Sequence, residues 1–282
     1  MARIQMTFAA GIVRRPTLIL ALIVAAAGAG CTKPPAQPGQ TVQPAQPVQP
    51  NGDALLAQRL LNASPYEIAS DPKMLEFVRT TAQAAITSHC ASCHGADLTG
   101  KPGVPNLVDD VWLWGVSPED DQNDVAPVMA IQQTILYGIR NKNCEKGVSK
   151  DPYGVCPDTR NSEMPGFQAT KVFTAAQVSD LTEYVIKLSG GQADAAAVAR
   201  AKPNWKVCVE CHKKDGSGFL PYGGPNLTDK ESLYGADRAT IHDVIANGRG
   251  GACPPFESVL DAPTIKALAV YIFKTGQEKT QN

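Results

Sequence analysis

The chain has 282 residues and a formal net charge of −1 at pH 7, with 26 Lys and Arg against 27 Asp and Glu. It contains no basic stripe, and this argues against nucleic acid as a partner. The length allows two small domains and a tether. The sequence contains eight cysteines, a number that suggests functional or disulfide-bonded thiols. Both uses fit an exported, oxidising compartment.

Residues 1–31 have the features of an export or anchoring signal. Arg14 and Arg15 precede an apolar run over residues 18–27, which is short for a bilayer span but normal for a signal sequence. Residues 28–31 resemble a bacterial lipobox, in which Cys31 would be lipidated, although Gly28 stands where Leu is usual. A lipoprotein, an uncleaved membrane anchor and a cleaved soluble form all remain open.

Residues 32–51 are rich in Pro and Gln. Such a segment cannot bury a core, so we expect a flexible, extended linker. A short helical lead-in is expected over residues 52–76, beginning with a helix from Gly52 to Leu61.

Two Cys-x-x-Cys-His strings are the most informative motifs. This spacing is typical of c-type haem attachment, in which two thiols form thioethers with the vinyl groups and the adjacent His ligates iron. A zinc ribbon would need two Cys pairs close in sequence, whereas these pairs lie more than a hundred residues apart. We therefore expect two covalently bound haem c groups, attached through Cys90, Cys93 and His94 and through Cys208, Cys211 and His212.

The strings belong to an internal repeat with an offset of about 120 residues. Further landmarks recur in the same order: residues 105–107 and 225–227 (Pro-Asn-Leu), Trp114-Gly115 and Tyr234-Gly235, Gly138 and Gly248, and residues 181–186 and 268–273. Two copies of one domain are predicted, over residues 77–191 and 195–278. The first copy has an insertion after Arg140.

Each copy has helical periodicity, and no strand-like alternation persists. A middle helix is expected at residues 128–139 and 238–246. A last helix is expected to begin near Asp180 and Thr264 and to end at Gly190 and Gly276. The fold class is therefore all-α, with two tandem class I cytochrome c domains.

A second axial ligand would make each haem a low-spin electron carrier. In the first copy Met164, followed by Pro165, predicts His94/Met164 ligation. No methionine follows Met164, and Cys253, also followed by Pro, occupies the matching place in the second copy. Cys253, His242 and an open iron remain alternatives as sixth ligand of the His212 haem, and a thiolate would lower its potential. The His94/Met164 haem is then expected to have the higher potential.

Cys144 and Cys156 bracket a polar loop in the insertion and are predicted to form a disulfide. Arg140 and Arg249 follow the middle helices, where each could contact haem propionates or be simply exposed. Trp112 and Trp114 could pack on haem or in an ordinary core.

Two runs of sequence resemble a known family, the dihaem subunit III of cbb3-type cytochrome c oxidases (CcoP/FixP). The first comprises residues 138–140 and 158–165, and the second comprises residues 208–212, 215–218, 224–229, 233–235 and 239–241. The resemblance implies a membrane-tethered subunit that relays electrons from a periplasmic donor to a haem-copper oxidase core. The chain departs from the family's pattern in its lipoprotein-like leader, its Cys144–Cys156 loop and Cys253 in place of the second methionine.

The expected function is therefore electron transfer at the periplasmic face of the bacterial inner membrane, without catalysis by the chain itself. Two alternatives remain. One is a dihaem enzyme, either similar to thiosulfate dehydrogenase with its His/Cys haem or similar to peroxidases with an open haem. The other is the cytochrome subunit of a periplasmic dehydrogenase.

Overall fold

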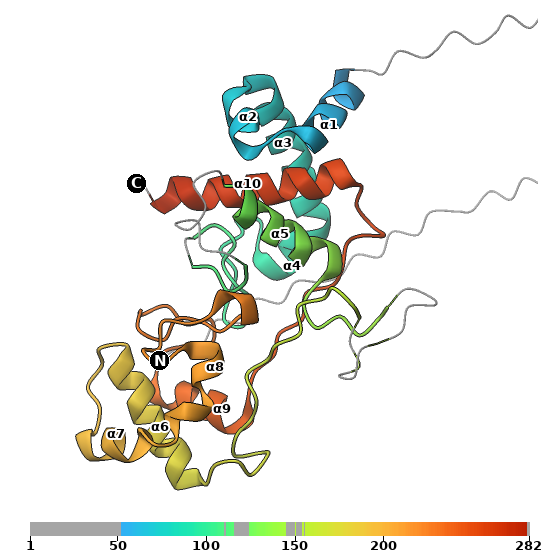
Figure 1. Cartoon of the computed structure of the whole chain (residues 1–282). Helices are drawn as coiled ribbons and strands as arrows, with labels where there is room; N and C mark the ends of the chain where they lie inside the picture. Colours follow the sequence, from blue (N-terminus) through green and yellow to red (C-terminus); the bar gives the residue numbers. More distant parts are fainter. Residues whose placement is uncertain are drawn as a thin grey trace, which may run out of the picture. The chain divides into compact units, whose positions relative to one another are not determined.

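A computed structural model describes residues 52–109, 111–115, 124–144, 150, 154 and 156–280 (Figure 1). The expected signal, the lipidation of Cys31 and the linker lie outside these residues. Within the described part no helix combines the length and apolarity needed to cross a membrane. The same part contains isolated β-bridges but no strand, and the architecture is helical, as expected.

The lead-in is formed by α1 (Gly52–Asn62) and α2 (Pro65–Ser70), which are followed by α3 (Pro72–Ala85). Ser64 and Glu67 form a capping box at the start of α2, and Asp71 caps α3. Lys266 in the C-terminal helix donates from Nζ to the carbonyl oxygens of Leu61 (2.9 Å) and Ala63 (2.7 Å). The lead-in is thereby fixed to the end of the chain.

The first module combines early helices with the last one. It comprises α1 to α3, the π-helical turn η1 (Ile86–Cys90), α4 (Ala91–His94), α5 (Val125–Tyr137) and α10 (Ala262–Thr280), and α10 packs on α3 and α5. The face of α10 that meets these helices is apolar, and Phe273 is fully buried there. The buried cores of this module are drawn from both ends of the sequence: Leu60, Met74, Val78, Val128, Ala267, Val270 and Phe273 in one cluster, and Ala82, Ile86, Leu98, Val108, Leu268 and Ile272 in another.

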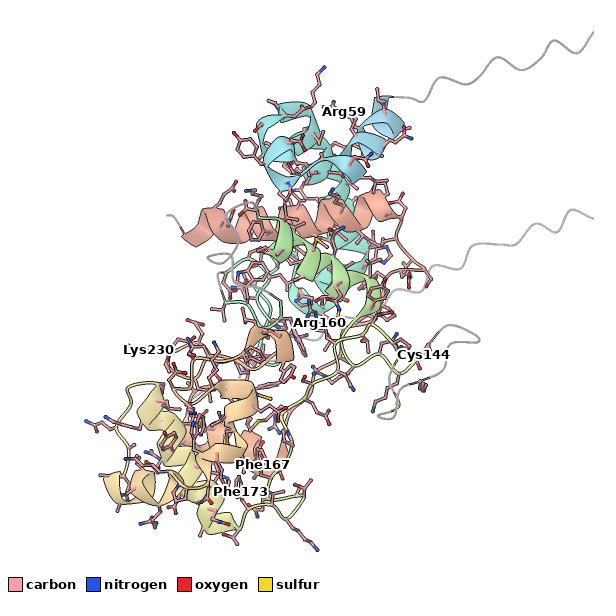
Figure 2. All side chains as sticks on the ribbon, in the orientation of Figure 1. Arg59, Cys144, Arg160, Phe167, Phe173 and Lys230 are labelled. Carbon is pink, nitrogen blue, oxygen red and sulfur yellow. A yellow bond between two sulfur atoms is a disulfide. The ribbon has the colours of Figure 1, made fainter. Side chains whose placement is uncertain are left out.

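The second module consists of the middle of the chain. It comprises α6 (Ala175–Leu188), α7 (Ala195–Ala201), η3 (Trp205–Val207), α8 (Val209–His212), η4 (Leu220–Tyr222) and α9 (Arg238–Asn247), and α6 packs on α7 and α9. Its core includes Phe167 and Phe173, whose ring centroids lie 5.2 Å apart (Figure 2). Val178, Leu181, Trp205 and Ile245 complete this core.

The two last helices are therefore exchanged relative to the sequence repeat. We expected α6 to close the first copy and α10 to close the second, whereas α6 packs with α9 and α10 packs with α5. The packed modules thus differ from the contiguous stretches 77–191 and 195–278. In addition, α10 does not end at Gly276 but continues to Thr280.

Two connectors make this exchange. The first connector, residues 138–174, leads from α5 to α6, and the second connector, residues 248–261, leads from α9 to α10. They pair antiparallel through hydrogen bonds in both directions between Ile139 and Cys253 (2.9 and 3.2 Å) and between Met164 and Arg249 (2.9 Å each). Figure 1 shows them running side by side.

Candidate haem sites

Each Cys-x-x-Cys-His string lies on a short helix. Cys90 ends η1 and is followed by α4, which ends at His94, while Cys208 caps α8, which ends at His212. The residues that follow each His leave the helical conformation with positive φ, Gly95 at 81° and Lys213 at 61°. Both thiols and the imidazole of each string are thus brought onto one helical turn.

A proline carbonyl orients each imidazole. His94 Nδ1 lies 2.9 Å from the oxygen of Pro105, and His212 Nδ1 lies 3.0 Å from the oxygen of Pro225. Because a carbonyl can only accept, Nδ1 carries the proton in each pair and Nε2 is left with a free lone pair. This is the arrangement that orients a histidine for ligation of iron.

The Pro-Asn-Leu loops are held by equivalent hydrogen bonds. Asn106 Oδ1 accepts from the amide of Val108, and Asn226 Oδ1 accepts from the amide of Thr228, both at 2.9 Å. The sequence repeat identified these loops as landmarks but did not show that their carbonyls hold the histidines.

Met164 faces His212. The two residues line one cavity with Cys208, and its walls are otherwise apolar, formed by Leu181, Val185, Trp205, Leu227 and Ile245. Burial raises the pKa of the Cys208 thiol to about 11 and lowers the pKa of His212. The structure thus places Met164 with His212, whereas the sequence predicted its pairing with His94, because the first connector carries Met164 out of the first module.

Cys253 lies at the first site. Its side chain is half-buried, and desolvation, followed by the neighbouring thiols of Cys90 and Cys93, raises the pKa of Cys253 to about 11. Three residues on, the ring of Phe256 meets that of His89 edge-on, with centroids 6.1 Å apart. The second connector thus returns Cys253 to the first module, whereas the sequence left it as one of three alternatives at the His212 haem.

His242 does not line the His212 cavity. The face of α9 that packs into the second module is formed by Ile241, Ile245 and Ala246. Among the described residues, Met164 is therefore the sulfur or nitrogen donor that meets His212 across the cavity.

The surroundings of Gly138 and Gly248 show that each connector leads into the other module. Gly138 ends α5 with φ of 74°, and a Cβ there would lie 2.4 Å from the carbonyl oxygen of Cys253. Gly248 ends α9 with φ of 76°, and a Cβ there would lie 2.5 Å from the carbonyl oxygen of Met164. Each middle helix thus ends against the sulfur residue of its own module, which comes from the opposite copy in sequence.

The two predicted propionate-binding arginines are engaged with the protein. Arg140 donates to the carbonyl oxygens of Gly251 and Ser162, and so ties the second connector to the first. Arg249 donates to Asp243 and, at 2.7 Å, to the oxygen of Gly248. A third arginine, Arg160, was not singled out from sequence, although it precedes Met164 by the same interval as Arg249 precedes Cys253.

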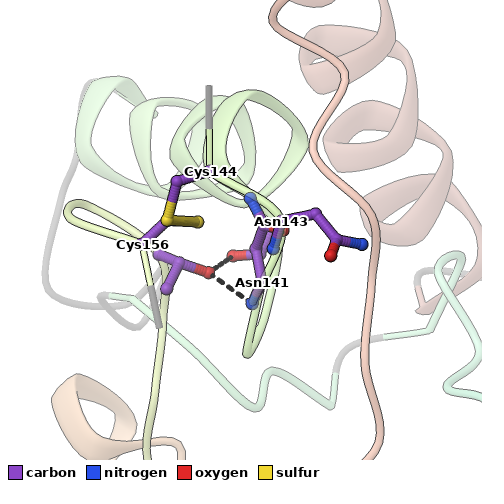
Figure 3. Close-up of a disulfide and its surroundings, with 6 residues drawn as sticks. Asn141, Asn143, Cys144 and Cys156 are labelled. Carbon is purple, nitrogen blue, oxygen red and sulfur yellow. Dashed lines mark hydrogen bonds between the residues drawn. A yellow bond between two sulfur atoms is a disulfide. The ribbon is translucent and has the colours of Figure 1, made fainter. Parts of the chain in front are cut away.

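Cys144 and Cys156 form a disulfide (Figure 3). The amide of Cys156 donates to the carbonyl oxygen of Asn141 at 2.8 Å, and Asn143 donates to the side chain of Asn141 at 2.9 Å. The disulfide therefore closes the inserted loop near the start of the first connector.

These residues fit covalent haem c. Each site offers two thiols and an imidazole with Nε2 free. At the second site the walls are apolar, and Met164 from the first connector lines the same cavity as the imidazole.

Comparison with known proteins gives the family. A family model described as "Cytochrome C oxidase, cbb3-type, subunit III" matches residues 194–272, and one described as "Cytochrome c" matches residues 80–189. The chain is 39% identical to a cbb3-type cytochrome c oxidase subunit FixP of Bradyrhizobium sp. (strain ORS 278), over 81% of this chain and 71% of the relative. It is 34% identical to a CcoP subunit of Cereibacter sphaeroides, over 79% of this chain and 70% of the relative. The chain belongs to the CcoP/FixP family.

This cbb3-type subunit III family membership confirms the resemblance seen in the sequence, and with it the two cytochrome c domains of the fold prediction. The two matched stretches correspond to the two copies of the sequence repeat. The exchange of last helices is a property of their packing and leaves the order of the motifs unchanged.

Proposed function

We propose that the chain is a dihaem electron-transfer subunit of a membrane respiratory complex, a cbb3-type haem-copper oxidase. The observation that carries this proposal is the presence of two complete proximal sites on one chain, each faced by a sulfur residue from a connector. The chain passes electrons from a periplasmic donor to the oxidase core and does not itself catalyse oxygen reduction. Its N-terminus anchors it at the periplasmic face of the bacterial inner membrane, through a lipid or a helix.

The ligand sets follow from the exchanged connectors. Bound haem c supplies a centre that gains and loses one electron at each site. His212 and Met164 are proposed to ligate one iron, and His94 and Cys253 the other. A thioether ligand favours a high potential and an anionic thiolate favours the ferric state, so the His212 site has the higher potential. This order is opposite to the one expected from the sequence.

The surroundings of Cys253 favour a carrier over an enzyme that acts on sulfur compounds. Such an enzyme needs free cationic groups to hold an anionic substrate. Arg140 contacts the second connector, but it donates hydrogen bonds to two backbone carbonyl oxygens and is therefore not a free cationic group.

The test begins with the number of haems on the purified chain, measured by mass and by the pyridine haemochrome, for which two are expected. A redox titration of wild type and Cys253→Met follows. The substitution should raise the lower potential by on the order of a few hundred millivolts, because axial ligands set haem potentials over a wide range. The higher potential should stay in place.

One haem per chain would refute the dihaem proposal, and an unshifted lower potential would refute the Cys253 ligand. Turnover with thiosulfate would favour the enzyme alternative. Copurification of the tagged chain with an oxidase core tests the partner.

A further inference from the structure

Two aromatic residues make reciprocal contacts between the loops that follow the haem-binding motifs. A Cβ on Gly223 would lie 2.4 Å from Cζ2 of Trp114, and a Cβ on Gly103 would lie 3.6 Å from Cε1 of Tyr234. Trp114 and Tyr234 are equivalent in the repeat, as are Gly103 and Gly223. Each aromatic ring of one module therefore lies on the glycine of the other module's loop.

Backbone hydrogen bonds hold these loops together. The amide of Gly115 donates to the oxygen of Leu220 at 3.2 Å, and the amide of Gly103 donates to the oxygen of Leu233 at 2.8 Å. The contact is thus fixed by main chain on both sides of the rings, which limits how far the loops can separate.

An arginine covers each ring. The guanidinium carbon of Arg160 lies 5.3 Å from the centroid of the Trp114 ring, and that of Arg249 lies 5.8 Å from the centroid of the Tyr234 ring. These are cation–π distances. Arg160 also donates to Thr134 Oγ1 (2.9 Å) and to the oxygen of Ala130 (3.0 Å), so it is held firmly against α5.

Trp114, which belongs to the first module, consequently contacts residues close in sequence to both sides of the second site. Gly223 lies two residues before Pro225, whose carbonyl holds His212. Arg160 lies four residues before Met164, which faces His212.

Tyr234 makes the corresponding contacts at the first site. Gly103 lies two residues before Pro105, whose carbonyl holds His94, and Arg249 lies four residues before Cys253.

We propose that Trp114 and Tyr234 form an aromatic bridge through which the two sites exchange electrons. The proposal rests on the proposed function, since it requires a haem at each site. Electron tunnelling is faster through packed atoms than across gaps, and each ring packs against the loop of the other module. One electron leaves the reduced site and reduces the oxidised one, and no bond forms or breaks.

The test is Trp114→Leu in the full-length protein loaded with both haems. After rapid photoreduction, the electron redistributes between the two centres, and their different ligands give different absorption bands. We expect a several-fold slower redistribution in Trp114→Leu, a smaller effect in Trp114→Phe, and slowing again in Tyr234→Leu. Tyr222→Leu is the matched control, because Tyr222 is a half-exposed aromatic residue next to Gly223 outside the reciprocal contact.

One further readout separates the bridge from a structural role. Axial-ligand signals in EPR should be unchanged in Trp114→Leu, because neither aromatic residue is a ligand. In case Trp114→Leu fails to fold, Trp114→Phe and Tyr234→Leu provide the test.

An unchanged redistribution rate in the folded Trp114 and Tyr234 variants would overturn the proposal, as would equal slowing in Tyr222→Leu. The haem count made beforehand distinguishes this failure from failure of the proposed function.

Discussion

Gly248 and Gly190 have nearly the same positive φ angle but different surroundings. Their φ angles are 76° and 78°, and each follows the last residue of a helix or its cap. A Cβ on Gly248 would lie 2.5 Å from the carbonyl oxygen of Met164, whereas a Cβ on Gly190 would meet nothing within 4 Å. Gly190 therefore serves as the comparison for the contact that Gly248 makes with the ligand residue.

Gly190→Ala should cost about 1 kcal/mol of unfolding free energy through strain alone. Gly248→Ala should cost more and should also change the absorption and EPR signals of the His212 site, because Met164 must move. Denaturant unfolding and EPR of the two variants measure these effects. Equal costs with unperturbed signals in both would contradict the contact.

Glu183 joins three elements of the second module. One carboxylate oxygen accepts from Arg238 Nε on α9 at 2.5 Å, and the other accepts from the amide of Asp194 before α7 at 2.8 Å. The hydrogen bond from Arg238, followed by that from Asp194, lowers the pKa of Glu183 in the folded protein. A lowered folded-state pKa means that this contribution to stability is present above the unfolded-state pKa and is lost as pH falls through the folded-state pKa.

Glu183→Gln should lower the free energy of unfolding by at most about 1 kcal/mol near neutral pH, since a charge-assisted pair with an exposed arginine is replaced by a weaker neutral one. The difference from wild type should shrink as the pH drops below about 4, where the unfolded carboxyl also binds a proton. Denaturant titrations at several pH values measure it. Glu257→Gln, at an exposed side chain, is the control and should show no such trend. A difference that is independent of pH would contradict the role of the Glu183 charge.

The exchange of helices makes opposite predictions for two equivalent leucines. Leu181 on α6 and Leu268 on α10 match in the sequence repeat, and each side chain is 1% exposed. Leu181 belongs to the cluster that contacts Met164 and Cys208, and Leu268 to the cluster that contacts Cys90.

Each Leu→Ala substitution should destabilise the protein by about 2–5 kcal/mol because it leaves a cavity. Leu181→Ala should perturb the haem bound through His212, and Leu268→Ala should perturb the haem bound through His94. Site-resolved spectra and mass analysis of the haem peptides measure this. The reverse assignment would support contiguous domains.

At the scale of the whole molecule, the repeat could be predicted because its motifs are local. The Cys-x-x-Cys-His strings, the helices and the Cys144–Cys156 pair are encoded by nearby residues, and their placement required no knowledge of packing. The partner of each last helix could not be predicted in this way. The apolar face of α6 would suit either α5 or α9, because the two copies have similar sequences.

The difference between the ligand sets expected from sequence and those proposed from the structure has the same origin. Met164 lies between α5 and α6 in sequence, so assigning it to His94 assumed that the chain returns to the module it left. The connectors instead pair antiparallel at two points, between Ile139 and Cys253 and between Met164 and Arg249. A pairing between segments about a hundred residues apart is a tertiary property, and single-sequence periodicity contains no signal for it.

We infer that the connectors exchange the sulfur ligands between the modules. The decisive measurement is low-temperature EPR of the ferric protein in which Cys90→Ala and Cys93→Ala block haem attachment at the first site. We predict that the thiolate-type low-spin signal disappears while the His/Met signal of the second site remains. A surviving thiolate signal would place Cys253 on the His212 haem and contradict the exchange.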